Sequence, residues 1–175
     1  MDVDRLAGVG IPVWVTEIDS LEATFESFRR LFGDVLQVGI PDWAVEAELE
    51  WSRPPDLPAV RTLAPIWRDP WMVVGGATFA GDVIRRLGLV NAAEGAPERY
   101  PKRSVEELTG LGPELVLLPD EPYAFSATDG PEVFPRVATA LVSGRDLTWY
   151  GPSLVTARRR LTDAVLDALG GPGGS

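Results

Sequence analysis

Aromatic and charged side chains crowd one short stretch of this sequence. The segment IWRDPWMVVGG carries Trp67, Arg68 and Trp71 and ends on Gly75 and Gly76. Flat aromatic faces beside a guanidinium suit a large, mostly apolar ligand that has a few polar groups. A single tryptophan more often serves as core packing, so the interpretation as a binding site depends on whether other aromatic residues gather at the same place.

Two further stretches place aromatic residues directly after a predicted strand. Tyr123 and Phe125 follow the apolar run ELVLLP, and Trp149 and Tyr150 follow ATALVSG. The carboxyl ends of parallel strands meet at one edge of a sheet, which is where α/β folds bind ligands. We therefore expect three loops to bring large aromatic residues to one edge, where charged residues of the same loops supply polar contacts. These charged residues are Arg68, Asp69, Asp120 and Glu121.

Catalytic and metal-binding chemistry has few candidates. The sequence contains no cysteine and no histidine, which removes disulfides, thiolate nucleophiles, histidine bases and most transition-metal ligands. The carboxylate pairs Glu106-Glu107 and Asp120-Glu121 are expected at a helix start and in a loop, where neither resembles an acid–base pair. We therefore expect no enzymatic activity, no catalytic residue and no metal bound directly by side chains.

The Gly75-Gly76 turn leaves a second binding chemistry open. A glycine-rich turn between a strand and a helix can hold a phosphate at the helix N-terminus. The stretch VVGGATFAGD has neither the Lys-Ser/Thr pair of a P-loop nor the spacing of the dinucleotide fingerprint. A tight packing turn is the simpler explanation.

Composition bounds the remaining functions. Of 175 residues, 45% are hydrophobic and 24% are charged, as in an ordinary folded domain. The net charge of −10 argues against nucleic-acid binding, and the basic cluster Arg158-Arg159-Arg160 is expected to be a solvated helix face. The opening MDVDRLAGVG lacks the features of a secretory signal, and no apolar run is long enough for membrane insertion. As written, the sequence predicts a cytoplasmic location.

The first third of the chain predicts one strand and two helices. A short strand is expected at Val13–Thr16, followed by a helix that Ser20 caps and Gly33 ends. A second helix is expected over residues 41–51, with Asp42 as its cap, and the breaker-rich SRPPDLP ends it. The apolar residues of the first helix recur at helical spacing and are Leu21, Phe25, Phe28, Leu31 and Phe32.

The remaining chain alternates strands with helices. A strand over residues 60–67 precedes a helix that Thr78 opens and Gly88 closes. Ser104 caps a short helix, with Glu107 in the capping-box position. The stretches ELVLLP and RVATALVSG predict two more strands, and PSLVTARRRLTDAVLDALG predicts a terminal helix. This order predicts a Rossmann-like α/β fold with a mostly parallel sheet and flanking helices.

Three stretches together resemble a known family, and they are IWRDPWMVVGGATFAGDVIRRLGLVN, APERYPKRSVEELTGLGPELVLLPDEPYAF and DLTWYGPS. The resemblance, from Val60 to Leu169, is to the carboxyl-terminal lobe of the substrate-binding proteins of ABC importers. Within this family, the sequence most resembles the branch whose two lobes are joined by a long helix and which takes up vitamin B12, haem and ferric siderophores. GIPVWVTE and the helix after it resemble the end of the amino-terminal lobe. The implied parts are a remnant of the amino-terminal lobe (1–40), a shortened inter-lobe helix and linker (41–58), the ligand-binding lobe (59–170) and a flexible tail (171–175).

The resemblance implies a ligand site and a partner site. In this family, loops at the lobe edges clamp a chelated metal or corrinoid between aromatic faces, so that the ion needs no protein ligand. Arg68 would donate a hydrogen bond to a carboxylate or amide of the ligand. Glu106 would face arginines of the ABC permease, although a helix-start carboxylate is an equal alternative. The implied ligand-binding residues are Trp67, Arg68, Trp71, Tyr123, Trp149 and Tyr150.

The resemblance thus implies a substrate-binding component of an ABC importer for cobalamin, haem or a ferric siderophore. Members of the family are periplasmic or on the cell surface, and most of their amino-terminal lobe lies outside this sequence. The alternative is a cytoplasmic α/β interaction module, or a nucleotide- or anion-binding domain that acts through Gly75-Gly76. An aromatic edge without its second lobe also predicts a homodimer that buries this edge.

Overall fold

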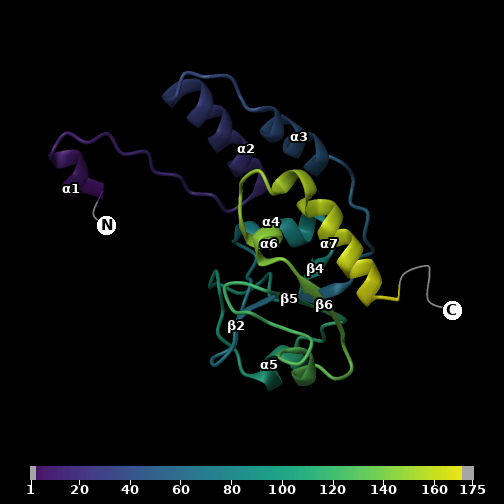
Figure 1. Ribbon diagram of the computed structural model, residues 1–175. Coiled ribbons are helices and arrows are strands. Elements are labelled where there is room, and N and C mark those ends of the chain that lie inside the picture. Colours follow the sequence, from purple (N-terminus) through teal and green to yellow (C-terminus); the bar gives the residue numbers. More distant parts are fainter. Residues whose placement is uncertain (1–2, 171–175) are drawn as a thin grey trace.

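A parallel β-sheet forms the centre of the computed structural model, which describes residues 3–170 (Figure 1). The strands lie in the order β4 (Val90–Asn91), β1 (Arg61–Leu63), β5 (Leu115–Pro119) and β6 (Ala138–Val142). Each neighbouring pair is parallel, and β5 pairs with β6 along its whole length. The predicted α/β fold with a mostly parallel sheet is confirmed.

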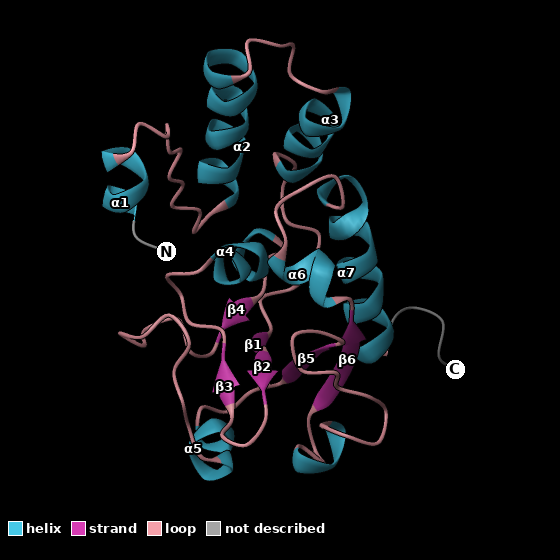
Figure 2. Cartoon of the chain, turned by 60° about the vertical axis from the view of Figure 1, so that its left-hand side comes forward, coloured by secondary structure: helices cyan, strands magenta, loops and turns pink. Residues whose placement is uncertain are grey.

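Helices cover both faces of this sheet (Figure 2). They are α4 (Phe79–Arg86), α6 (Gly144–Thr148) and α7 (Leu154–Ala168) on one side, and α5 (Val105–Gly110) on the other. Alternate residues of a strand point to opposite faces, so Leu115 and Leu117 join the cluster with α4 and α7. Val116 and Leu118 join a second cluster that includes Leu108 of α5. Burial on both faces explains why β5 is apolar throughout.

The strand predicted over residues 60–67 is divided in two. β1 ends at Leu63, and β2 (Pro65–Trp67) pairs antiparallel with β3 (Met72–Val73) in a separate hairpin. Pro65 has no N–H to donate to the parallel ladder, so the ladder stops before it. The turn of the hairpin contains Asp69, whose φ of 58° lies in the left-handed region. This hairpin carries Trp67 beyond the carboxyl end of β1.

The strand predicted at Val13–Thr16 is wrong. Residues 11–19 form no strand, and Val13–Thr16 are exposed, because no sheet edge within residues 3–170 pairs with them. The short helix α1 (Val3–Gly8) precedes this segment. The helix after it is confirmed as α2 (Leu21–Arg29), and the Ser20 hydroxyl accepts a hydrogen bond from the amide of Ala23 at 3.1 Å. Its predicted end at Gly33 is wrong, because the chain continues through Gly33 as a π-helix to Val35.

The helical arm of the molecule projects away from the sheet (Figure 1). It consists of α2, its π-helical extension η1 (Arg30–Val35) and α3 (Asp42–Trp51). Asp42 begins α3, so the N-cap position falls to Pro41 and not to Asp42 as predicted. Two buried hydrogen bonds fasten the arm to α4 and α7, the helices that cover one face of the sheet. The Leu21 amide donates to Asp82 at 2.8 Å, and the Trp51 indole N–H donates to the Leu154 carbonyl at 3.0 Å.

The predicted helix caps of the second half are confirmed. The Thr78 hydroxyl accepts from the amide of Gly81 at 3.0 Å, and Gly88 follows α4 with a φ of 99°. Ser104 and Glu107 form the reciprocal capping box of α5. Among the described residues, none of the helices has the length and apolar character needed to cross a bilayer. The flexible tail predicted for residues 171–175 lies outside the described residues, and the division into lobe parts stays a prediction.

Candidate ligand-binding site

Aromatic side chains extend past the carboxyl end of the sheet in two separate groups. In the first group, Trp67 from β2 is 43% exposed, and its ring contacts Tyr123 edge to face with centroids 5.8 Å apart. Tyr123 comes from the long loop between β5 and β6, which also contains the short helix η2 (Pro131–Val133). Residues far apart in sequence therefore form one aromatic pair at this edge.

The second group consists of Trp149 and Tyr150, which follow α6, the short helix after β6. They are 56% and 46% exposed. The Tyr150 ring packs edge to face on Phe79 at 5.6 Å, and the Arg145 guanidinium lies 5.6 Å from the centre of the Trp149 ring. Within residues 3–170, no aromatic contact joins this pair to Trp67 and Tyr123, so the edge presents two aromatic surfaces.

Trp71 occupies the core and not the surface of this edge. It is 6% exposed, stacks on Phe125 at 5.8 Å and meets Phe134 edge to face at 5.7 Å. Its burial conflicts with the expectation that it lines a cleft, because tertiary partners from the loop after β5 cover it. The Arg68 guanidinium lies 5.4 Å from the centre of the Trp71 ring, so Trp71 helps to hold Arg68 in place by a cation–π contact.

Arg68 is held by acidic neighbours that the sequence did not single out. Its guanidinium donates to the carboxylates of Asp129 and Glu132, the latter at 2.6 Å, and Tyr123 donates its hydroxyl proton to Asp129 at 2.7 Å. Hydrogen bonding from Arg68 lowers the pKa of Glu132, and Glu132 in turn raises the pKa of Arg68. The hydrogen bond to Asp129 raises the pKa of Tyr123. Arg68 is therefore already paired, with an excess of negative charge around it.

A second cluster of polar residues lies where β5 and β6 end. The cluster surrounds a cavity of about 470 Å³, which is lined by Asp120, Glu121, Ser143, Arg145, Asp146 and Arg160. Arg160 pairs with the buried Asp146 through two hydrogen bonds of 2.6 Å. Because Arg145 also lies against Trp149, this cavity adjoins the second aromatic surface.

The glycine turn is explained by packing. A Cβ atom at Gly75 would lie 2.6 Å from the carbonyl oxygen of Glu98, and one at Gly76 would lie 2.5 Å from that of Glu94. The first turn of α4 also carries the buried carboxylate of Asp82, which would repel an anion at this terminus. The close approach of two chain segments therefore accounts for both glycines without a phosphate.

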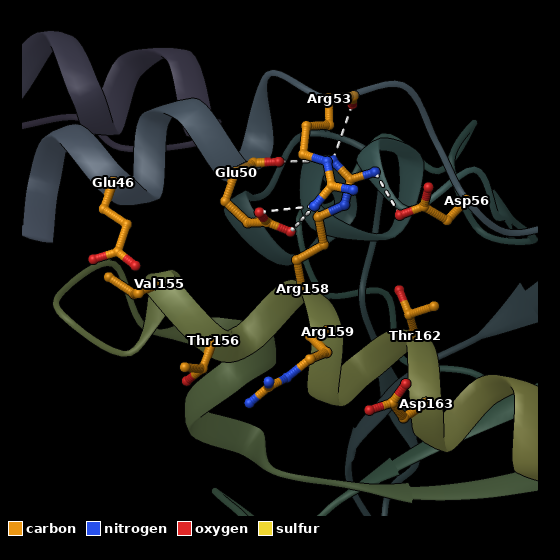
Figure 3. Close-up of a pocket in the computed structure, with 10 residues that line it drawn as sticks. All are labelled: Glu46, Glu50, Arg53, Asp56, Val155, Thr156, Arg158, Arg159, Thr162 and Asp163. Carbon is orange, nitrogen blue, oxygen red and sulfur yellow. Dashed lines mark hydrogen bonds and ion pairs between the residues drawn. The ribbon is translucent and has the colours of Figure 1, made fainter.

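A cavity of about 400 Å³ lies between α3 and α7, and none of the residues that line it is aromatic (Figure 3). Its central residue, Arg158, is only 1% exposed, so the expectation that the three arginines form a solvated face is wrong for Arg158. Its guanidinium donates to the carbonyl groups of Glu50, Arg53 and Pro54 and pairs with Asp56 at 2.9 Å. This arginine fastens the end of the helical arm and the linker to α7.

Glu106 lies exposed on α5, on the opposite side of the sheet from α7. Its neighbour Glu107 is used in the capping box, where hydrogen bonds from Ser104 lower its pKa. The Thr109 hydroxyl donates to the Glu106 backbone carbonyl, and within residues 3–170 no hydrogen bond reaches the Glu106 carboxylate, which is accessible. Over the same residues, no cluster of acidic side chains has the geometry to hold a metal ion.

Comparisons with known proteins identify the fold. No protein-family model matches the sequence, and no curated protein matches it significantly. Among solved structures, a periplasmic haem-binding protein from Pseudomonas aeruginosa is 26% identical, with a TM-score of 0.67 over 99% of this chain and 68% of that one. The haem-binding protein RhuT from Roseiflexus sp. RS-1 is 22% identical, with a TM-score of 0.68 over 95% of this chain and 71% of that one.

A third solved structure is that of a vitamin B12-binding protein. The periplasmic vitamin B12-binding protein BtuF of Vibrio cholerae is 11% identical, with a TM-score of 0.73 over 95% of this chain and 69% of that one. The chain therefore has the fold of the helical-backbone periplasmic substrate-binding proteins, as the sequence resemblance implied. It spans between 68% and 71% of the length of these three proteins.

Proposed function

We propose that this chain, which has the fold of periplasmic substrate-binding proteins, supplies one ligand-binding lobe of an ABC-importer receptor for a chelated metal such as cobalamin, haem or a ferric siderophore. The observation that carries this proposal is the pair of exposed aromatic surfaces at the carboxyl edge of the sheet. Trp67 with Tyr123 forms one surface and Trp149 with Tyr150 forms the other. Such surfaces suit a flat, largely apolar ligand.

The chemistry of the site favours a ligand that arrives with its metal already coordinated. The chain has no histidine and no cysteine, and these are the residues that most often bind transition metals in proteins. An aromatic face contacts the organic part of a chelate and makes no bond to the ion. The protein would act in transport and not in catalysis, as its structural neighbours do.

Glu106 is the residue that we propose for contact with the permease. Its exposed carboxylate on α5 is unused by the cap of the helix, and a surface carboxylate steers a partner that presents arginines. This function requires the lobe to lie outside the cytoplasmic membrane, as in the periplasmic neighbours. It contrasts with the cytoplasmic location expected from the first residues of the sequence.

The test is a tryptophan-fluorescence titration of the purified chain with cyanocobalamin and, separately, with haemin. We expect saturable quenching by at least one of them, since both absorb where tryptophan emits. Trp67→Ala or Trp149→Ala should weaken binding about tenfold, because each removes one aromatic face. Trp14→Phe is the matched control, because Trp14 is exposed on the segment before α2 and its ring lies against Arg30 of the helical arm.

A flat titration with both ligands, from a sample that circular dichroism shows to be folded, would contradict the proposal. Equal binding by all three variants would contradict the assignment of the aromatic surfaces. Affinity should be weaker than for a two-lobed receptor, because one lobe buries less of the ligand.

A further inference from the structure

The arginines beside the two aromatic surfaces differ in whether the protein already uses them. Arg68 donates to two carboxylates of the loop after β5, and Arg160 donates two hydrogen bonds to the buried Asp146. Arg145 is exposed, and within residues 3–170 no hydrogen bond or ion pair reaches its guanidinium. Its N–H donors are therefore available to a ligand.

Trp149 holds the free guanidinium of Arg145 beside the second aromatic surface. The guanidinium lies 5.6 Å from the centre of the Trp149 ring. A cation–π contact uses the face of the ring and leaves the hydrogen-bond donors of the arginine unused. A side chain that already has a packing partner also loses less conformational freedom when it binds a ligand. Arg145 is therefore positioned to reach the edge of a ligand whose ring lies against Trp149.

The cavity at the ends of β5 and β6 gives this ligand edge a place to enter. It has a volume of about 470 Å³, and Arg145 forms part of its wall. Ser143 lies in the same wall, and within residues 3–170 no hydrogen bond involves its hydroxyl. The wall thus offers a charged donor and a neutral donor that the protein does not use itself.

The carboxylates of the cavity oppose an anion to different extents. Asp146 is neutralised by Arg160, and the unpartnered oxygen of Glu121 is buried, out of reach of a ligand. Asp120 is exposed and forms no ion pair within residues 3–170, so it is the carboxylate that an incoming anion meets most directly. A direct hydrogen bond from a guanidinium outweighs a like charge that is not in contact, because the Coulomb energy falls with distance and water screens it. Asp120 should therefore weaken the attraction of Arg145 without reversing it.

We propose that the cavity next to Trp149 is a subsite for a carboxylate on the edge of the ligand and that Arg145 is its specificity-determining residue. The guanidinium donates hydrogen bonds to both carboxylate oxygens. The contact with a ligand carboxylate that the sequence suggested for Arg68 thus passes to Arg145, because Arg68 is already paired. The inference rests on the proposed function, since it concerns the periphery of the chelate that the aromatic surfaces bind. It narrows the ligand class from chelates in general to those with an anionic arm.

The test uses two ligands that share one ring system. Haemin carries two propionate groups, and its bis-amide carries two primary amides on the same porphyrin. Fluorescence titration should give about fivefold tighter binding for haemin, and Arg145→Gln should remove this preference while it leaves the affinity for the bis-amide nearly unchanged. Asp120→Asn keeps an acceptor for the Gly144 amide and should strengthen the binding of haemin. Arg159→Gln is the control, because it makes the same change in net charge at an exposed residue of the cavity between α3 and α7.

The outcomes separate the two proposals. Equal affinity of the unmodified chain for the two porphyrins, or tighter binding of the bis-amide, overturns the subsite and leaves the proposed function standing. Binding of cyanocobalamin, whose side chains are mostly amides, but of neither porphyrin has the same meaning. A preference for haemin that persists in Arg145→Gln, or that Arg159→Gln removes equally well, overturns the role of Arg145. Binding of none of the three ligands by a folded sample removes the proposed function and the subsite together.

Discussion

Replacement of Arg158 by methionine should destabilise the fold strongly. Arg158 is buried between α3 and α7, and it supplies donors to the carbonyl groups of Glu50, Arg53 and Pro54 (Figure 3). A hydrogen bond contributes about 1 kcal/mol net, so the loss of the three hydrogen bonds from Arg158 to these carbonyls corresponds to about 3 kcal/mol. The pair with the half-exposed Asp56 adds little, since such pairs are worth ~0–1 kcal/mol. Methionine refills much of the side-chain volume, which limits any cavity contribution.

The assay is urea unfolding followed by far-ultraviolet circular dichroism. For a chain of this length, each kcal/mol corresponds to about 2–4 °C in Tm, so a thermal scan should show a fall of about 6–12 °C. The neighbouring Arg159 gives a matched control, because it is exposed and Arg159→Met should change stability by less than about 0.5 kcal/mol. Arg158→Lys should fall between them, since an ammonium group cannot reach all of the carbonyls at once.

Buried charges can be replaced by apolar side chains without loss when their partners are replaced as well. Here the carbonyl partners belong to the backbone and remain. Equal stability of Arg158→Met and Arg159→Met would therefore refute the reasoning. It would mean that water satisfies the linker carbonyls as well as the guanidinium does.

Two further predictions concern the cap of α5 and the aromatic edge. Ser104→Ala should cost about 1 kcal/mol in urea unfolding at neutral pH, because it removes the cap. The pKa of Glu107 is lowered in the capping box, so its carboxylate stabilises the fold at pH values above the ordinary pKa of glutamate. This contribution is lost as pH falls through the lowered pKa. If the difference in unfolding free energy between the wild-type protein and Ser104→Ala stayed constant into the acid range, the link between the cap and Glu107 would be contradicted. The exposed edge should associate into a homodimer, seen as a rise of the sedimentation coefficient with concentration and reduced by Trp149→Ala. A single monomeric species at every concentration would exclude the dimer.

Local signals in the sequence were enough to predict much of the fold. The caps at Ser20, Thr78 and Ser104 depend on residues three positions apart, and the unbroken apolar run of β5 reports burial on both faces. The strand expected at Val13–Thr16 failed because a strand requires a partner edge, and apolar alternation does not reveal whether one exists. Pro65 carried a local signal for the division of β1 from β2 that the strand prediction did not use.

The sequence indicated which aromatic residues could form a site but not which of them are exposed or how they are arranged. Trp67 and Trp71 sit in the same short stretch, yet one is half exposed and the other is buried. The difference comes from Phe125 and Phe134, which only the fold brings to Trp71. The acidic partners of Arg68 likewise lie more than sixty positions away. The excess of negative charge around Arg68 could therefore be recognised only from tertiary contacts.

Under the proposed function, these contacts would determine which part of a ligand the protein recognises. If a metal is held wholly by its chelator, side chains that never touch the ion cannot discriminate between metals by coordination. Selection must then act on the shape of the flat ring and on the charge of its substituents. Aromatic faces accept most flat rings, whereas charged side chains beside them favour some substituents of the ring over others. Specificity at this edge is thus expected to depend more on the charged residues beside the aromatic surfaces than on the aromatic surfaces themselves.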